Sequence, residues 1–221
     1  MDDDLLQQIK KTKWETYPLD RMLPKETVLN LFLEKYKQAD NKGLLAKNSR
    51  TNKRLREGYW SLFACVALDI LEQSNHLIFF PNDDRNDVSF ISTNDLGAIR
   101  PKMNFMEFDV KEYTQFSAKT GFDSFIRKVI NPNRSIYGII IGVHEDIGLL
   151  HPKSLFSTDD HDRGVFLIAQ DDPDKQDEME AHVLFIMGTN VLFDRTVSLA
   201  ESISSNKTNT IYQDKLRGLP R

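Results

Sequence analysis

The segment Met103–Tyr113 reads MNFMEFDVKEY and alternates apolar with charged side chains. Successive residues of a β-strand point to opposite faces of a sheet. One face would therefore carry the apolar residues Met106, Phe108 and Val110. The other would carry the charged residues Glu107, Asp109 and Lys111. We predict a strand that packs one face into the core and presents two carboxylates beside an ammonium group on the other.

The sequence on either side of this segment completes a mixed α/β pattern. Apolar residues at helical spacing predict a helix over 52–73 and an amphipathic helix over 120–130. Apolar runs predict four strands, at His76–Phe80, Asp87–Ser92, Met103–Tyr113 and Ile136–His144. The last run is apolar almost throughout, as expected of a central strand covered on both faces. We predict an α/β fold with a mixed central sheet and an α-β-β-β-α-β core over residues 52–144.

Two extensions flank this core. Residues 1–51 form the N-terminal extension, in which a helix is predicted to begin near Pro24. Residues 145–221 form the C-terminal extension, where Val165–Ala169 is a candidate strand. A long helix is predicted over 179–202, although its HVLFIM run is also typical of a strand. We expect a single domain over 1–221, with helices at both ends of the core, because 221 residues suit one domain.

The composition excludes several classes of protein. The single cysteine, Cys65, rules out an internal disulfide and a cysteine-rich zinc site. The longest apolar run is far shorter than the roughly 20 residues that span a bilayer. The first residues, MDDDLLQQIKK, are acidic, whereas a secretory signal is basic and then apolar. We therefore expect a soluble cytoplasmic protein that does not associate with a membrane.

Charge is unevenly distributed along a chain whose net charge is −4. The stretch from Lys42 to Arg56 contains six basic residues and no acidic ones, whereas Asp159–Glu180 contains nine acids against two bases. The local field determines where a polyanion binds, so the basic stretch is a candidate nucleic-acid surface. A solvated linker that enters a helix explains it equally well. The candidate phosphate contacts are Lys47, Arg50, Lys53, Arg54 and, further along the chain, Lys119.

An acid-x-Lys tripeptide carries information only in context. It occurs twice here, as Asp40-Asn41-Lys42 and as Asp109-Val110-Lys111, and only the second lies in a predicted strand. Two further acids accompany that strand. Asp87 opens the strand before it, and Glu57 lies on the helix that precedes the sheet.

This arrangement resembles the PD-(D/E)xK nuclease superfamily, which has a restriction-endonuclease-like fold, and the resemblance covers about residues 52–144. It matches Asp87 to the first acid of the family, Asp109 and Lys111 to its acid-x-Lys, and Glu57 to the acid of its first core helix. The chain also departs from the family pattern. Asn86 stands where a proline is usual, so Asp83 or Asp84 is an alternative to Asp87, and the additional acid Glu107 would share or replace the role of Asp109.

The resemblance implies a nuclease that uses Mg²⁺ or Mn²⁺ to hydrolyse phosphodiester bonds in DNA, or alternatively in RNA. The metal ligands would be Asp87, Asp109, Glu57 and the carbonyl of Val110. Lys111 would position the attacking water or the phosphate. A homodimer or a protein partner is compatible with this function. One alternative is an inactive member of the same fold that binds a partner protein or nucleic acid in an immunity or regulatory role. Another is a small-molecule-binding domain with a pocket near His144.

Each candidate residue also has a purely structural interpretation. Lys111 would then form an ion pair with a neighbouring acid on a solvated sheet face. Asp87 would cap the end of a turn, and Glu57 would be an ordinary exposed acid on a helix.

Overall fold

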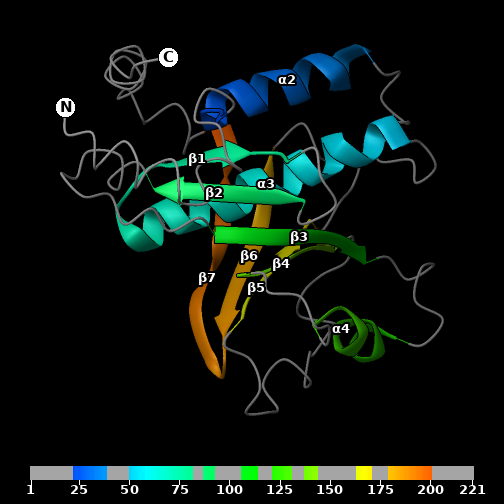
Figure 1. Ribbon diagram of the computed structural model, residues 1–221, viewed down its shortest axis with the longest axis vertical. Coiled ribbons are helices and arrows are strands. Elements are labelled where there is room, and N and C mark those ends of the chain that lie inside the picture. Colours follow the sequence, from blue (N-terminus) through cyan, green and yellow to red (C-terminus); the bar gives the residue numbers. More distant parts are fainter. Residues whose placement is uncertain are drawn as a thin grey trace, which may run out of the picture.

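The computed structural model describes residues 22–38, 50–81, 87–92, 106–113, 121–130, 137–143, 163–170 and 179–200, without the side chains of 36–38 and 50–52. Within these ranges the chain forms a seven-stranded sheet and three helices (Figure 1). No helix among them is long and apolar enough to cross a membrane.

The strands follow one another across the sheet in the order in which they occur in the chain. They are β1 (His76–Phe79), β2 (Val88–Ser92), β3 (Met106–Tyr113), β4 (Gly138–Val143), β5 (Gly164–Ala169), β6 (Glu180–Met187) and β7 (Asn190–Ser198). Strands β3, β4 and β5 are parallel to one another, and every other neighbouring pair is antiparallel. The sheet is therefore mixed, as the sequence predicts.

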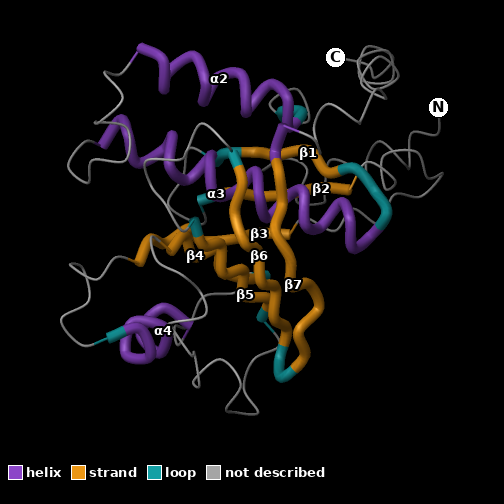
Figure 2. The backbone as a smooth tube through the Cα atoms, turned by 180° about the vertical axis from the view of Figure 1, so that it is seen from behind, coloured by secondary structure: helices purple, strands orange, loops and turns teal. Residues whose placement is uncertain are grey.

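The helices lie on opposite faces of this sheet (Figure 2). Helix α3 (Arg50–Glu72) covers one face, where its stripe of Tyr59, Leu62, Phe63 and Val66 is fully or almost fully buried. Helix α2 (Lys25–Gln38) packs against α3 and β1. Helix α4 (Phe122–Ile130) lies between β3 and β4 in the chain and covers the other face. A helix in this position is the usual connection between two parallel strands.

Two apolar clusters reflect this layered arrangement. The larger lies between the sheet and α3 and contains Phe90, Phe108 and Phe166, and the smaller lies under α4. In β3 the residues Met106, Phe108 and Val110 face the larger cluster, which confirms the face that the alternating pattern predicts. The order α3-β1-β2-β3-α4-β4 also agrees with the predicted succession of helices and strands.

The prediction of a C-terminal helix over 179–202 is wrong. The structure has a β-hairpin there, β6 and β7, which together with β5 widens the sheet beyond the predicted core. Gly188 makes the turn with a φ of 60°, a conformation that favours glycine. Both faces of β6 are covered, since Val183 and Phe185 face the cluster under α3 and Leu184 and Ile186 face the cluster under α4. A strand buried on both faces lacks the alternation that identifies a strand in sequence.

Candidate functional site

Strands β2 and β3 separate where the predicted acids lie. Their pairing runs from Phe90↔Met106 to Val88↔Phe108, so the second half of β3 extends past the start of β2. Asp87 stands at this point. Its N–H donates to the carbonyl of Phe108 at 3.1 Å, and its Oδ2 accepts from the N–H of Val110 at 2.8 Å. The Asp87 carboxylate therefore takes the place of a strand partner for Val110.

Lys111 lies close to both aspartates. Its Nζ lies 3.4 Å from Oδ2 of Asp87 and 3.9 Å from Oδ2 of Asp109. The Lys111 side chain is 40% exposed, whereas Asp109 is buried. Three residues from two strands thus form a compact group, in which the ammonium is accessible and the carboxylates are largely covered. We call Asp87, Asp109 and Lys111 the carboxylate site.

Glu57 lies beside this group, in the first half of α3. Its side chain is only 4% exposed, so the interpretation as an exposed helix acid is wrong. Oε1 lies 3.0 Å from Lys53 Nζ in an ion pair without hydrogen-bond geometry, and Oε2 lies 3.3 Å from Nη1 of Arg54. Burial raises the pKa of Glu57; the Lys53 ammonium works against this shift, and the negative charge of Asp87 adds to it. Glu57 and Asp87 therefore interact electrostatically.

Arg54 links the helix to the strands. Its Nη1 lies 3.3 Å from the carbonyl oxygen of Asp87, in addition to its contact with Glu57, and its Nη2 donates to the carbonyl of Pro81 at 3.2 Å. The guanidinium thus joins α3 to residues on both sides of the β1–β2 connection. This contact positions Glu57 relative to Asp87.

The donor atoms fit a magnesium-sized cation in part. Among the described residues, no three Asp, Glu, His or Cys side chains lie close enough together to hold a metal ion. Asp87 and Asp109 nevertheless converge on one nitrogen atom. The carbonyl of Val110 faces the same side of β3 as its N–H, toward Asp87, because both groups of a strand residue point to one edge. Mg²⁺ often uses only one or two protein carboxylates with water and substrate, so Asp87 and Asp109 are candidate ligands without a third acid.

The candidate phosphate contacts are only partly described. Lys53 and Arg54 are 61% and 50% exposed and lie next to the carboxylate site. Arg50 begins α3, but its side chain is outside the description. Glu107 lies opposite Ser89 in the strand register, in the part of β3 that is paired with β2. The remaining predicted positions are outside the described residues: Lys47, Asp83, Asp84, Lys119, His144 and all the acids of the Asp159–Glu180 segment except Glu180, which begins β6.

Two polar groups were not predicted. In one, Arg56 Nε donates to Glu112 Oε2 at 2.8 Å and Trp60 Nε1 donates to Glu112 Oε1 at 3.0 Å, which fixes α3 against the end of β3. The other, which we call the buried network, contains Lys25, Asp69, Glu72 and His76. Asp69 and Glu72 lie three residues apart, which places them on one helix face, and this spacing was the available signal.

The buried network is tightly paired. Lys25 forms an ion pair with Asp69 and donates to the carbonyl of His76 at 3.4 Å. The His76 ring nitrogens lie 2.8 Å from Asp69 Oδ1 and 3.1 Å from Glu72 Oε2. These contacts join α2, α3 and β1, so the network positions the helix from which Glu57 projects.

Comparison with family models, with curated proteins and with solved structures finds no match for this chain. A function is therefore inferred from its own residues.

Proposed function

We propose that this chain is a metal-dependent nuclease that hydrolyses phosphodiester bonds of DNA in the cytoplasm. The observation that supports this function is the convergence of Asp87, Asp109 and Lys111 where β2 and β3 separate. The order α3-β1-β2-β3-α4-β4 supports a restriction-endonuclease-like core, as the resemblance to the PD-(D/E)xK superfamily implies.

Each residue of the carboxylate site has a role in this proposal. Asp87, Asp109 and the Val110 carbonyl would hold Mg²⁺ or Mn²⁺. The cation would supply positive charge to the phosphate oxygens and lower the pKa of the attacking water. Lys111 would donate hydrogen bonds to a phosphate oxygen and stabilise the negative charge that develops there. Its exposure allows contact with a substrate, and its two aspartate neighbours keep the amine directed at the site.

The first turns of α3 would bind the substrate backbone. Lys53 and Arg54 are half exposed or more and lie within one helical turn of Glu57. Basic side chains beside a hydrolytic site can contact flanking phosphates without reading the base sequence. Binding through such contacts weakens as salt increases.

One observation favours the second candidate, an inactive member of the fold that binds a partner protein or nucleic acid. The carboxylates already have partners within the chain, since Asp87 accepts from Val110 and Glu57 is paired with Lys53 and Arg54. Acids whose charge is neutralised within the chain can hold the elements of the fold together without taking part in catalysis.

A cleavage assay separates the two candidates. Plasmid and single-stranded DNA would be incubated with the protein and Mg²⁺ or Mn²⁺, and wild type compared with Asp109→Ala and Lys111→Ala. We expect each variant to lose about 100-fold or more in rate, since loss of one transition-state contact has effects of that size. The matched controls are Asp194→Ala on β7 and Lys128→Ala on α4, both exposed and not members of the carboxylate site. Binding of DNA without cleavage would support the second candidate, and equal rates in all variants would contradict the assigned roles.

A further inference from the structure

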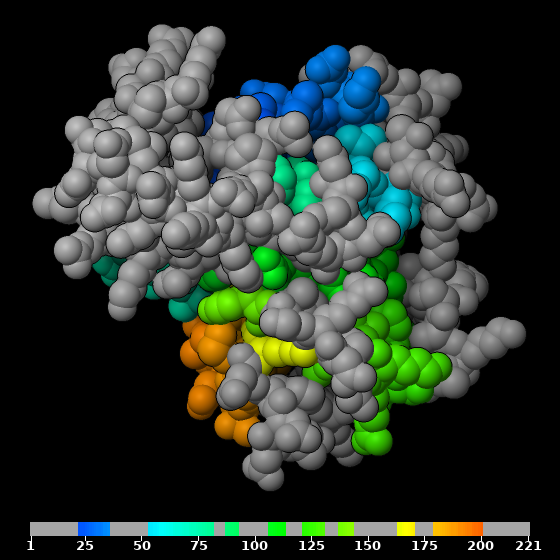
Figure 3. Space-filling model, in the orientation of Figure 1, coloured from blue at the N-terminus to red at the C-terminus, as the bar shows by residue number. Residues whose placement is uncertain are grey.

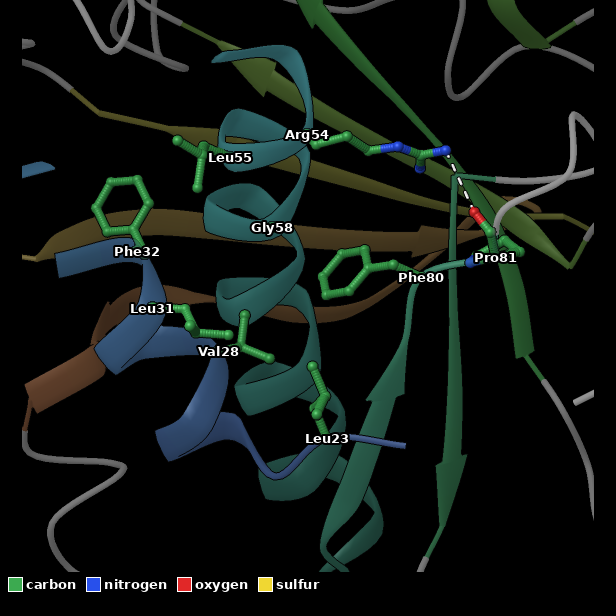
Figure 4. Close-up of a pocket in the computed structure, with 9 residues that line it drawn as sticks. All are labelled: Leu23, Val28, Leu31, Phe32, Arg54, Leu55, Gly58, Phe80 and Pro81. Atoms are coloured by element: carbon green, nitrogen blue, oxygen red, sulfur yellow. Dashed lines mark hydrogen bonds between the residues drawn. The ribbon is translucent and has the colours of Figure 1, made fainter. Parts of the chain in front are cut away.

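A groove lies between α2, α3 and the end of β1, next to the carboxylate site (Figure 4). Its volume is about 310 Å³, within the range of pockets that hold small ligands. Val28, Leu31 and Phe32 line it from α2, and Phe80 and Pro81 line it from the other side. The space-filling view shows that α2 and the first turns of α3 adjoin on the molecular surface (Figure 3).

Gly58 forms the floor of this groove. Glycine is unfavourable in the interior of a helix, so its presence in the middle of α3 needs a reason. Packing does not supply one, because a Cβ at this position would lie 3.6 Å from Phe80 Cζ and 3.9 Å from Val28 Cγ1, which are ordinary contacts. The missing side chain instead leaves open the space between Val28 and Phe80. The glycine therefore has the effect of keeping the groove open.

Arg54 stands at the rim and is the only charged residue among the described residues that line the groove. Figure 4 shows its side chain extended from α3 to the carbonyl of Pro81. The carbonyls of Pro81 and Asp87 and the carboxylate of Glu57 hold the guanidinium in place, while half of the side chain stays accessible and keeps further N–H donors for a ligand. A guanidinium has five N–H donors in a planar fork that matches a carboxylate. An apolar groove with a fixed cation at its rim is complementary to an apolar molecule with one negative group.

We propose that the groove binds a medium-chain monocarboxylate from solution. The alkyl chain would lie over Gly58, between Val28 and Phe80, and the carboxylate would contact Arg54. This inference rests on the groove and its rim and not on the metal site, although Arg54 is also one of the phosphate contacts of the proposed nuclease function.

Calorimetry with decanoate as the probe tests the proposal on the intact protein. We expect one saturable site, and octanoate should bind about 15-fold more weakly. This follows from a transfer free energy of about 0.8 kcal/mol per methylene, or about 4-fold in affinity for each of the two carbons removed. The neutral analogue 1-octanol should bind at least 5-fold more weakly than octanoate, since it lacks the charge that pairs with Arg54. Absence of saturable decanoate binding up to millimolar concentration would overturn the proposal, even if an apolar peptide bound the groove.

Variants then locate the site. Arg54→Gln should weaken decanoate binding at least 5-fold, whereas Arg127→Gln, on exposed α4 surface, should leave it unchanged. Gly58→Leu should fill the floor and weaken binding at least 10-fold. If that variant does not fold, Gly58→Ala provides the test. Its Cβ makes only ordinary contacts, so the protein should fold, and decanoate should bind about 3-fold more weakly. Wild-type affinity in Arg54→Gln, or in the folded Gly58 variant, would overturn the assignment.

Discussion

The buried network and the carboxylate site both combine carboxylates with a lysine, yet they differ in how far solvent reaches the charges. In the buried network the side chains of Lys25 and Asp69 are only 5% and 10% exposed. In the carboxylate site Lys111 is far more accessible and lies 3.4 and 3.9 Å from its two aspartates. The pair of Lys25 and Asp69 is closed to solvent, whereas Lys111 is open to solvent and more loosely paired.

This difference indicates two uses of the same residue types. In the buried network the contacts join α2, α3 and β1, and the ammonium of Lys25 is covered by protein. Such a group affects stability, because any broken pair leaves a buried charge. In the carboxylate site solvent reaches Lys111, whose contacts of 3.4 and 3.9 Å can be broken at small cost. Such a group suits binding and chemistry.

The largest effect is expected from Asp69→Ala. This change leaves the buried Lys25 without its carboxylate and should lower the free energy of unfolding by about 3–5 kcal/mol. Asp109→Ala removes a 3.9 Å contact to a partly exposed amine and should cost less, about 1 kcal/mol. Urea denaturation of both variants measures the two losses. Similar losses would remove the distinction between the two groups.

Substitutions at Asp87 separate its structural from its chemical role. Asp87→Ala leaves the N–H of Val110 without this acceptor and should cost about 1–3 kcal/mol. Asp87→Asn keeps an oxygen in the same place and should stay within about 1 kcal/mol of the wild type. Both should abolish cleavage, because neither provides a carboxylate. A stability in Asp87→Ala equal to that of Asp87→Asn would show that the hydrogen bond to Val110 is unimportant.

A smaller, pH-dependent effect is expected at Glu57. Burial raises its pKa in the folded state, whereas the unfolded chain has the ordinary value of about 4.3. Above that value the unfolded state ionises first, so this group's contribution to stability is lost as the pH rises through the folded pKa. Glu57→Gln removes the titration, so the variant should gain stability relative to wild type as the pH rises from about 4.3 through the folded pKa.

Thermal unfolding across this range measures the difference for Glu57→Gln, with Glu180→Gln on the exposed surface of β6 as the control. A constant difference between Glu57→Gln and the wild type at all pH values would mean that Glu57 titrates alike in both states.

The sequence predicts those features that depend on local patterns. Alternation along Met106–Tyr113 identifies the face of β3 that carries Asp109 and Lys111, and helical spacing identifies α3. The hydrogen bond from Val110 to Asp87 is not predicted, because it depends on where β2 begins relative to β3. The burial of Glu57 is missed for a similar reason, since its cover comes from other elements of the fold.

In the C-terminal region the sequence pattern predicts the wrong element. The HVLFIM run of β6 favours a helix with a strand as the alternative, because a strand covered on both faces does not alternate apolar with polar residues. The Gly188-Thr189 turn would have indicated a hairpin, since a glycine between two apolar runs is typical of a tight turn.

Titration of Mn²⁺ into the protein by calorimetry tests the central claim most directly, because it does not depend on which substrate is cleaved. We expect one saturable site per chain in the wild type, strongly weakened in Asp87→Asn and in Asp109→Asn. The control Asp194→Asn changes a carboxylate 2.7 Å from His182 Nε2 on the exposed surface and should bind as the wild type does. Absence of uptake by the wild type, or equal uptake by all four proteins, would contradict a metal site formed by Asp87 and Asp109.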